Sequence, residues 1–329
     1  MLTPETLAKL TRLRRLLKAD ERVVLAYSGG IDSSLLAYLG QQMLGDHLLA
    51  VTCVSPLLPP AERIAARRFT ASHGIRHMEW PTPDLDCDAV AHNAPDRCYH
   101  CKYRRFAALL EYARTHGYRA VWEGSNIDDL GQYRPGLRAL RELPVTSPYL
   151  GANFTKADIR DVARHLGLPI WDKPAAPCLA TRFPYGTKLD APTLSKVAVV
   201  ETLLRAVLGE PLRLRYDGHA ATIEADAKRL ARISAKRKQK LLQCVRQCGI
   251  ATVQFAPDGY RSGRYDHEDK KKHLAEVFFI GWLAESRAEI RSRRHSPDGV
   301  TRRLECRPAR ASAALCARSR KSAAADTCR

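Results

Sequence analysis

The 329-residue chain has no long apolar run, and none of its hydrophobic stretches approaches the ~20 residues that a membrane-spanning helix needs. The N-terminus also lacks the apolar segment and the small-residue cleavage site of a secretory signal peptide. These absences exclude integral membrane proteins and predict a cytoplasmic location. In that compartment the ten cysteines are expected to be thiols, metal ligands or reactive sulfurs rather than disulfides.

Two common phosphate-binding motifs are also missing, namely the P-loop with its lysine and the dinucleotide fingerprint G-x-G-x-x-G. The chain instead has an apolar run over residues 23–27, a turn with two glycines, and a helical pattern over 35–44. A strand, turn and helix N-terminus bind anions because backbone N–H groups point at the ligand. Six residues are expected to hold phosphate groups there, with the carboxylate near Mg²⁺: Ser28, Gly29, Gly30, Asp32, Ser33 and Ser34.

Strand patterns alternate with helix patterns through the first part of the chain. Residues 48–54, 75–80 and 118–123 favour strands, and 61–73 and 103–115 favour helices. This order predicts an α/β fold with a doubly wound parallel sheet over residues 1–190, with ligands at the carboxyl ends of the strands. Asn126 and Asp128 follow one such strand and are candidates for contact with nucleotide or magnesium, with a solvated loop as the alternative.

The pattern changes after residue 190. A helix over 195–208, strands over 212–216 and 220–225, a basic helix over 226–248 and a strand over 250–255 predict a small α+β domain, residues 191–263. Residues 264–329 form a basic tail, which is expected to be disordered because its last 43 residues have almost no large apolar side chains. With 12 Lys and Arg against 4 Asp and Glu in residues 287–329, nucleic acid is a candidate partner of the tail.

Three cysteines lie in segments suited to chemistry. Cys98 and Cys101 form a C-x-x-C motif at the head of a helix, whose dipole is expected to lower the thiol pKa. Cys178 lies in a proline-rich loop over residues 170–186, near Lys173 and Arg182, whose charges favour a thiolate. The alternatives are half of a zinc site completed by His100 and His92, a redox pair, cluster ligands, or inert buried thiols. Three thiolates on a [4Fe–4S] cluster would leave one iron open for a ligand such as sulfide.

Six motifs, in order, resemble the LarE-type ATP-dependent sulfur transferases, which belong to the ATP pyrophosphatase (PP-loop) superfamily. They are SGGIDSS, RCYHCK, EGSNIDD, KPAAPCLATRFPYG, LRLRYDG and DGYRSG, and the resemblance covers residues 5–263. It implies that ATP adenylylates a carboxylate of a pyridinium bis-carboxylate mononucleotide and releases pyrophosphate. A protein-held sulfur then displaces AMP, which gives a thiocarboxylate for the nickel-pincer nucleotide cofactor of lactate racemase.

The resemblance also implies roles for individual residues. Cys178 matches the sulfur-bearing cysteine, which in one branch is sacrificed to dehydroalanine and in another ligates a [4Fe–4S] cluster with two further cysteines. The presence of Cys98 and Cys101 favours the cluster branch, so the implied cofactors are ATP, Mg²⁺ and a [4Fe–4S] cluster. Glu201 is expected to hold a divalent cation. The substrate phosphate is expected to contact Arg182, Arg213, Arg215 and Arg261, for which a solvated basic strand face is the alternative.

The strong positive charge of the chain leaves two rival functions open. A net charge of +19 and the basic helix at 228–240 also suit a tRNA thiolase with the same loop, and a nucleic-acid-binding protein with a vestigial loop is the second rival. The family implies other enzymes of the same cofactor pathway as partners, and a homo-oligomer. The tail departs from the family pattern, which usually ends shortly after the GYR-x-G motif.

Overall fold

The computed structural model describes residues 1–131, 135–261 and 263–265, all of which belong to one compact unit, Met1–Lys270. The predicted tail, apart from Arg264 and Tyr265, lies outside the described residues. Within those residues no helix is both long enough and apolar enough to cross a membrane.

The first sheet of the described chain contains four parallel strands in the order β3-β2-β1-β4. Their bounds are β1 Val23–Ala26, β2 Leu48–Val54, β3 His77–Pro81 and β4 Ala120–Trp122. Leu25 is paired with Ala50 on one side and with Trp122 on the other, which sets the register. The predicted α/β fold is confirmed.

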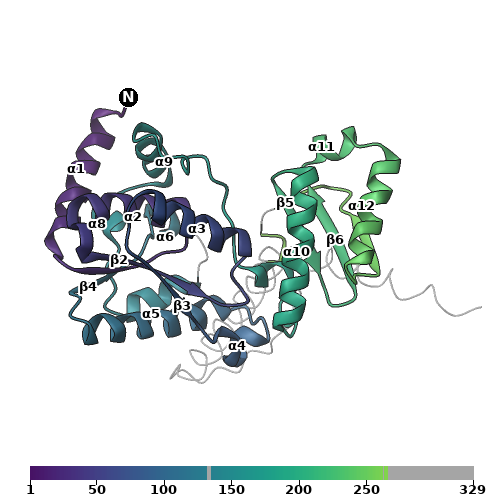
Figure 1. The fold of residues 1–329 in the computed structure, drawn as a ribbon, viewed down its shortest axis with the longest axis horizontal. Helices are drawn as coiled ribbons and strands as arrows, with labels where there is room; N and C mark the ends of the chain where they lie inside the picture. Colours follow the sequence, from purple (N-terminus) through teal and green to yellow (C-terminus); the bar gives the residue numbers. More distant parts are fainter. Residues whose placement is uncertain (132–134, 262, 266–329) are drawn as a thin grey trace, which may run out of the picture. The chain divides into compact units, whose positions relative to one another are not determined.

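Helices cover both faces of this sheet (Figure 1). Side chains alternate along β1, so Leu25 packs into a core with α1 and α2, whereas Val24 packs against Phe106 and Leu109 of α5. The helices before the second sheet are α1 Pro4–Ala19, α2 Ile31–Leu44, α3 Pro60–Ser72, α4 Asp88–Ala91, α5 Arg97–Thr115, α6 Ile127–Leu130, α7 Pro135–Glu142, α8 Pro148–Gly151 and α9 Lys156–His165. Short 3₁₀ helices are η1 Gly45–His47, η2 Asp84–Asp86 and η3 Leu179–Arg182.

The second sheet of the described residues has the order β5-β6-β7, with β5 and β6 antiparallel and β6 and β7 parallel. The elements of this region are α10 Ala191–Leu208, β5 Leu212–Tyr216, β6 Ala220–Ala225, α11 Ala227–Arg232, α12 Ala235–Gln247 and β7 Thr252–Phe255. The basic helix expected over 226–248 is divided in two, because Ser234 caps a new helix by accepting a hydrogen bond from the Arg237 N–H. The domain boundary at residue 190 stays a prediction.

The proline-rich loop packs against two cores. Ile170 and Trp171 pack against the core that contains α1 and α2, and the part from Cys178 onward packs against the core of the second sheet. Leu179 and Ala180, which follow Cys178, are buried in one cluster with α10 and β5. The buried Asn93 side chain donates to the carbonyls of Phe183 (3.1 Å) and Pro184 (2.8 Å), which fastens the loop to the segment before α5. The fold therefore brings Cys178 toward the head of α5, where the C-x-x-C motif lies.

Candidate active site

A tight turn joins β1 to α2. Gly29 has a φ of +73°, and a Cβ added there would lie 3.1 Å from the Ala66 Cβ, so both backbone and space require glycine. The Ser28 and Ser33 hydroxyls are 3.0 Å apart, and the Gly30 N–H donates to the Ser28 hydroxyl at 3.3 Å. No side chain caps the N-terminus of α2, so the turn presents a helix N-terminus that suits an anion.

The predicted phosphate-binding residues are divided between pocket and interior. Three residues of the turn, Ser28, Gly30 and Asp32, line a pocket with a volume of about 870 Å³. Ser34 is fully buried, and its hydroxyl is 3.2 Å from the Tyr27 hydroxyl. Burial raises the pKa of Tyr27 to about 12, so this hydroxyl pair stays neutral. Ser34 therefore supports the turn from inside.

Lys156 is the main neighbour of the Asp32 carboxylate. The Lys156 ammonium lies 2.7 and 2.6 Å from the two carboxylate oxygens, and the Asn126 amide is 3.5 Å from one of them. Asn126 caps α6, and Asp128 accepts a hydrogen bond from the Lys156 main-chain N–H at 2.7 Å. Neither Asn126 nor Asp128 lines the pocket, so their side chains position Lys156 and Asp32 in this structure.

The sequence prediction missed Lys156 as a site residue. A lysine in the first turn of a helix is electrostatically unfavourable, since the helix dipole is positive there. Its position at the start of α9 could therefore have indicated a nearby carboxylate. Lys173 was expected to favour the Cys178 thiolate, but its ammonium instead bonds to the Gly29 carbonyl (2.8 Å) and to Glu62 (2.7 Å).

Three sulfurs share the pocket with the phosphate-binding turn. Cys98 and Cys101 come from the head of α5, and Cys178 comes from the loop before η3. Burial, with smaller contributions from Asp84 and the other two sulfurs, raises the pKa of Cys101 to about 12 against the opposing charge of Arg105. The expected lowering of the Cys101 pKa by the helix dipole is therefore wrong, because desolvation of the thiolate outweighs it.

The donor side chains of the described residues do not form a site for a single metal ion. Among the described residues, no three His, Cys, Asp or Glu side chains converge on a point that would suit one metal ion. His100, a candidate zinc ligand, bonds to Asp96 at 3.0 Å. A four-iron cluster binds each thiolate through a different iron, so its ligand sulfurs are more widely spaced than those of a single ion. Three thiols lining one pocket fit that wider donor set.

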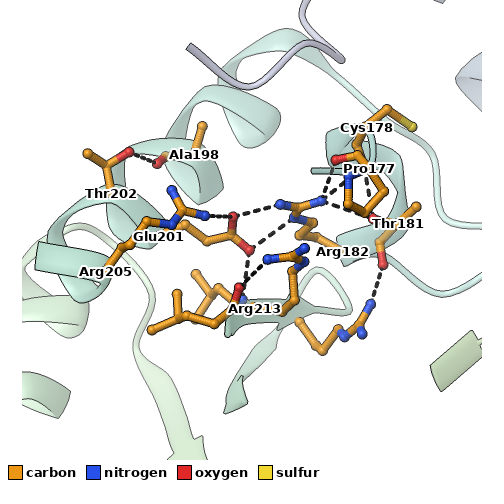
Figure 2. Close-up of polar contacts among 12 residues, drawn as sticks. Pro177, Cys178, Thr181, Arg182, Ala198, Glu201, Thr202, Arg205 and Arg213 are labelled. Carbon is orange, nitrogen blue, oxygen red and sulfur yellow. Dashed lines mark hydrogen bonds and ion pairs between the residues drawn. The ribbon is translucent and has the colours of Figure 1, made fainter. Parts of the chain in front are cut away.

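Arg182 and Glu201 form a buried ion pair under Cys178 (Figure 2). They are 1% and 2% exposed, and two parallel N–H···O bonds of 2.9 Å join them. Arg182 also donates to the carbonyls of Pro177 (2.7 Å) and Cys178 (3.2 Å). Glu201 accepts from the Leu214 N–H at 2.9 Å. Neither side chain lines the pocket. We expected Arg182 to contact the substrate phosphate and Glu201 to hold a cation. In this structure they pair with each other and anchor the loop.

Arg213 and Arg215 of β5 line the pocket, and their contact with a substrate phosphate stays a prediction. Arg213 donates to the Ala175 carbonyl at 3.0 Å, and burial together with the nearby Arg182 lowers its pKa. Arg215 pairs with the buried Glu224 at 3.0 Å. The Arg261 side chain is exposed and pairs with Asp258, and only its carbonyl contacts Arg215.

The chain is similar in sequence to several known proteins. Residues 10–118 match a family model described as asparagine synthase. A pyridinium-3,5-bisthiocarboxylic acid mononucleotide synthase of Lactiplantibacillus plantarum is 33% identical over 262 residues, which cover 79% of this chain and 94% of that protein. An uncharacterised protein of Synechocystis sp. is 35% identical over 258 residues, with 78% and 96% covered, and one of Methanocaldococcus jannaschii is 29% identical over 263 residues, with 78% and 98% covered.

The chain belongs to the LarE-type ATP-dependent sulfur transferases. The predicted family, fold and enzyme class are confirmed. Of the three predicted functions, the similarity to the Lactiplantibacillus plantarum synthase supports the sulfur transferase. Enzymes of the PP-loop superfamily use ATP, usually together with Mg²⁺. The sequence prediction missed several pocket residues of this sulfur transferase besides Lys156: Arg97, Arg105, Tyr185, Tyr260 and Arg264.

Proposed function

We propose that this sulfur transferase adenylylates a carboxylate of a pyridinium bis-carboxylate mononucleotide and converts it to a thiocarboxylate. The observation that carries the proposal is that one pocket is lined both by the phosphate-binding turn, with Ser28 and Asp32, and by three cysteine sulfurs. Activation and sulfur transfer then occur without release of the reactive acyl adenylate. The similar synthase of Lactiplantibacillus plantarum, whose name specifies the bisthiocarboxylic product, supports this substrate class.

The first step is activation of the carboxylate. A carboxylate oxygen of the substrate attacks the α-phosphorus of ATP, and pyrophosphate leaves while the turn of Ser28, Gly29, Gly30 and Ser33 holds it. Asp32 would hold Mg²⁺, which would shield the charge of the phosphates. The Lys156 ammonium lies 2.7 and 2.6 Å from the two Asp32 carboxylate oxygens and supplies a further positive charge beside the turn.

The second step is sulfur transfer. A sulfur nucleophile attacks the carbonyl carbon of the acyl adenylate, the C–O bond to phosphate breaks, and AMP leaves with the electron pair. Cys178 holds that sulfur, or provides its own, in which case its Cβ–Sγ bond breaks with loss of the α-proton and dehydroalanine remains. The buried pair of Arg182 and Glu201 is a positioning device that fixes the Cys178 main chain, instead of the contacts with phosphate and a cation that we expected for these two residues.

Cys98, Cys101 and Cys178 are the residues that would hold a [4Fe–4S] cluster, which would supply an exchangeable sulfide for repeated turnover. Burial raises the pKa of Cys101 to about 12, so its thiol is a poor nucleophile at neutral pH. Ligation by iron would compensate the buried thiolate charge and release the proton.

The phosphate of the mononucleotide is assigned to the basic wall formed by Arg213 and Arg215. Arg261 is a secondary candidate, because its exposed side chain is already paired with Asp258. A cytoplasmic location suits a pocket that depends on reduced thiols. Other enzymes of the cofactor pathway and further copies of the chain are proposed as partners, and nucleic acid is assigned to the tail alone.

Anaerobic incubation of the purified protein with ATP and the dicarboxylate mononucleotide tests the proposal. Pyrophosphate, AMP and a thiocarboxylate are expected to form together, and omission of the mononucleotide should stop all three. Release of pyrophosphate with tRNA, but not with the mononucleotide, would favour the thiolase alternative instead.

A further inference from the structure

Arg97 is a buried charge that the steps above do not use. It is the first residue of α5, is 5% exposed, and lines the pocket together with Cys178. Its Nε atom is buried and has no hydrogen-bond partner within the described chain. One Nη atom donates to the Ala94 carbonyl over a long 3.5 Å, and the guanidinium lies 4.8 Å from the centre of the Tyr185 ring.

Other buried arginines of the same pocket have carboxylate partners. Arg105 pairs with Asp84, and Arg215 pairs with Glu224 at 3.0 Å. No carboxylate within the described ranges lies at ion-pair distance from Arg97. An unpaired charge is expensive to bury, so the missing negative charge is expected to come from a ligand.

The surroundings of Arg97 also favour an anion. Arg97 stands at the N-terminus of a 19-residue helix whose N-cap residue, Asp96, makes no capping hydrogen bond with its side chain. The positive end of the helix dipole therefore adds to the guanidinium charge.

We infer that Arg97 binds a carboxylate of the mononucleotide and holds it beside the Cys178 sulfur. The Nε edge of a guanidinium is planar and suits two parallel bonds to a carboxylate. The Arg97 guanidinium lies over the Tyr185 ring, which orients it at the wall of the pocket. This inference rests on the proposed function, because the carboxylate belongs to that substrate.

The test compares Arg97→Met with Arg104→Met, a control on the same helix whose side chain is exposed and does not line the pocket. Pyrophosphate release is measured with the dicarboxylate mononucleotide and with its monoamide. Arg97→Met should raise the KM for the dicarboxylate at least about tenfold, as loss of a charged hydrogen-bond pair does, without changing the KM for ATP. Arg104→Met should behave as the wild type.

The two mononucleotides identify which carboxylate is bound. Equal weakening of both means that Arg97 holds the reacting carboxylate, and weakening of the dicarboxylate alone means that it holds the second one. Should Arg97→Met fail to fold, Arg97→Lys keeps the charge but loses the planar fork, and its KM should be intermediate.

An unchanged KM for both mononucleotides in a folded Arg97 variant would overturn the inference. Equal losses for ATP and mononucleotide, with a lowered Tm, would also overturn it, because they indicate a structural role. If the wild-type protein itself releases no pyrophosphate with either mononucleotide, the proposed function fails first, and the two failures are thereby distinguished.

Discussion

The phosphate-binding turn and the sulfur-bearing wall of the pocket are built in different ways. The turn is formed by residues 28–34, which bond to one another through Ser28, Gly30 and Ser33. The sulfur wall combines the head of α5 with a loop some 80 residues later in the chain, and the buried Arg182–Glu201 pair anchors that loop. The turn is thus organised mainly by local hydrogen bonds, whereas the sulfur wall depends on tertiary packing.

The largest expected effect is at Asp32. Asp32→Ala removes the carboxylate that we assign to Mg²⁺ and leaves Lys156 without its partner. Pyrophosphate release should fall to background, and sulfur transfer should fall with it, because no acyl adenylate forms. Asp128→Ala, whose side chain does not line the pocket, should retain measurable release. Normal turnover by Asp32→Ala would show that the turn is not the ATP site.

Cys178→Ala should separate the two regions. Adenylylation should persist, because the turn is intact, while thiocarboxylate formation stops for lack of the sulfur. Mass spectrometry of the mononucleotide and a pyrophosphate assay report the two steps separately. Catalytic sulfur transfer by this variant would contradict the assignment of Cys178.

Lys156→Met should have an intermediate effect. Loss of one ammonium near the phosphates is expected to raise the KM for ATP about 10-fold to 100-fold, as for other charge-assisted hydrogen bonds. The same variant should bind the mononucleotide normally, which calorimetry can measure. Weakened mononucleotide binding with normal ATP binding would contradict this assignment, because it would mean that Lys156 contacts the mononucleotide and not ATP.

The anchor of the sulfur wall is tested through stability. Glu201→Gln leaves Arg182 buried without a counter-charge and should cost about 3–5 kcal/mol of unfolding free energy. Glu111→Gln breaks an exposed pair with Arg114 and should leave the unfolding free energy nearly unchanged. Chemical denaturation measures both variants, and equal costs would contradict an anchoring role for the buried pair.

The smallest effect concerns Cys101. Its pKa is raised to about 12, so at pH 8 the thiol is almost wholly protonated and should react with iodoacetamide far more slowly than the exposed Cys98. Its modification rate should rise as the pH approaches 12, because only the thiolate reacts. Peptide mass mapping of the iron-free protein measures this, and equal rates at pH 8 would contradict the burial argument.

The same contrast explains which features the sequence could predict. The turn, the alternation of strands and helices, and the C-x-x-C motif are local, and each was identified from neighbouring residues. Lys156 lies 124 residues from Asp32, and its importance follows only from their contact. Arg182 and Glu201 were identified as separate ligands, since a sequence does not show that two distant charges are buried against each other.

Arg97 illustrates the remaining limit. It stands beside Cys98 in the motif, but only burial and the missing hydrogen bond at Nε distinguish it from the exposed Arg104 of the same helix. Desolvation likewise reversed the expected pKa shift of Cys101, since the helix dipole is visible in the sequence and the depth of burial is not.

The central claim is that one pocket activates a carboxylate and sulfurates it. Its most direct test is an anaerobic single-turnover reaction of the wild-type protein with ATP and the dicarboxylate mononucleotide, followed by mass spectrometry. The account predicts AMP, pyrophosphate and a mononucleotide in which sulfur replaces a carboxylate oxygen, in equal amounts. Pyrophosphate without any sulfur-containing mononucleotide, or no reaction at all, would contradict it.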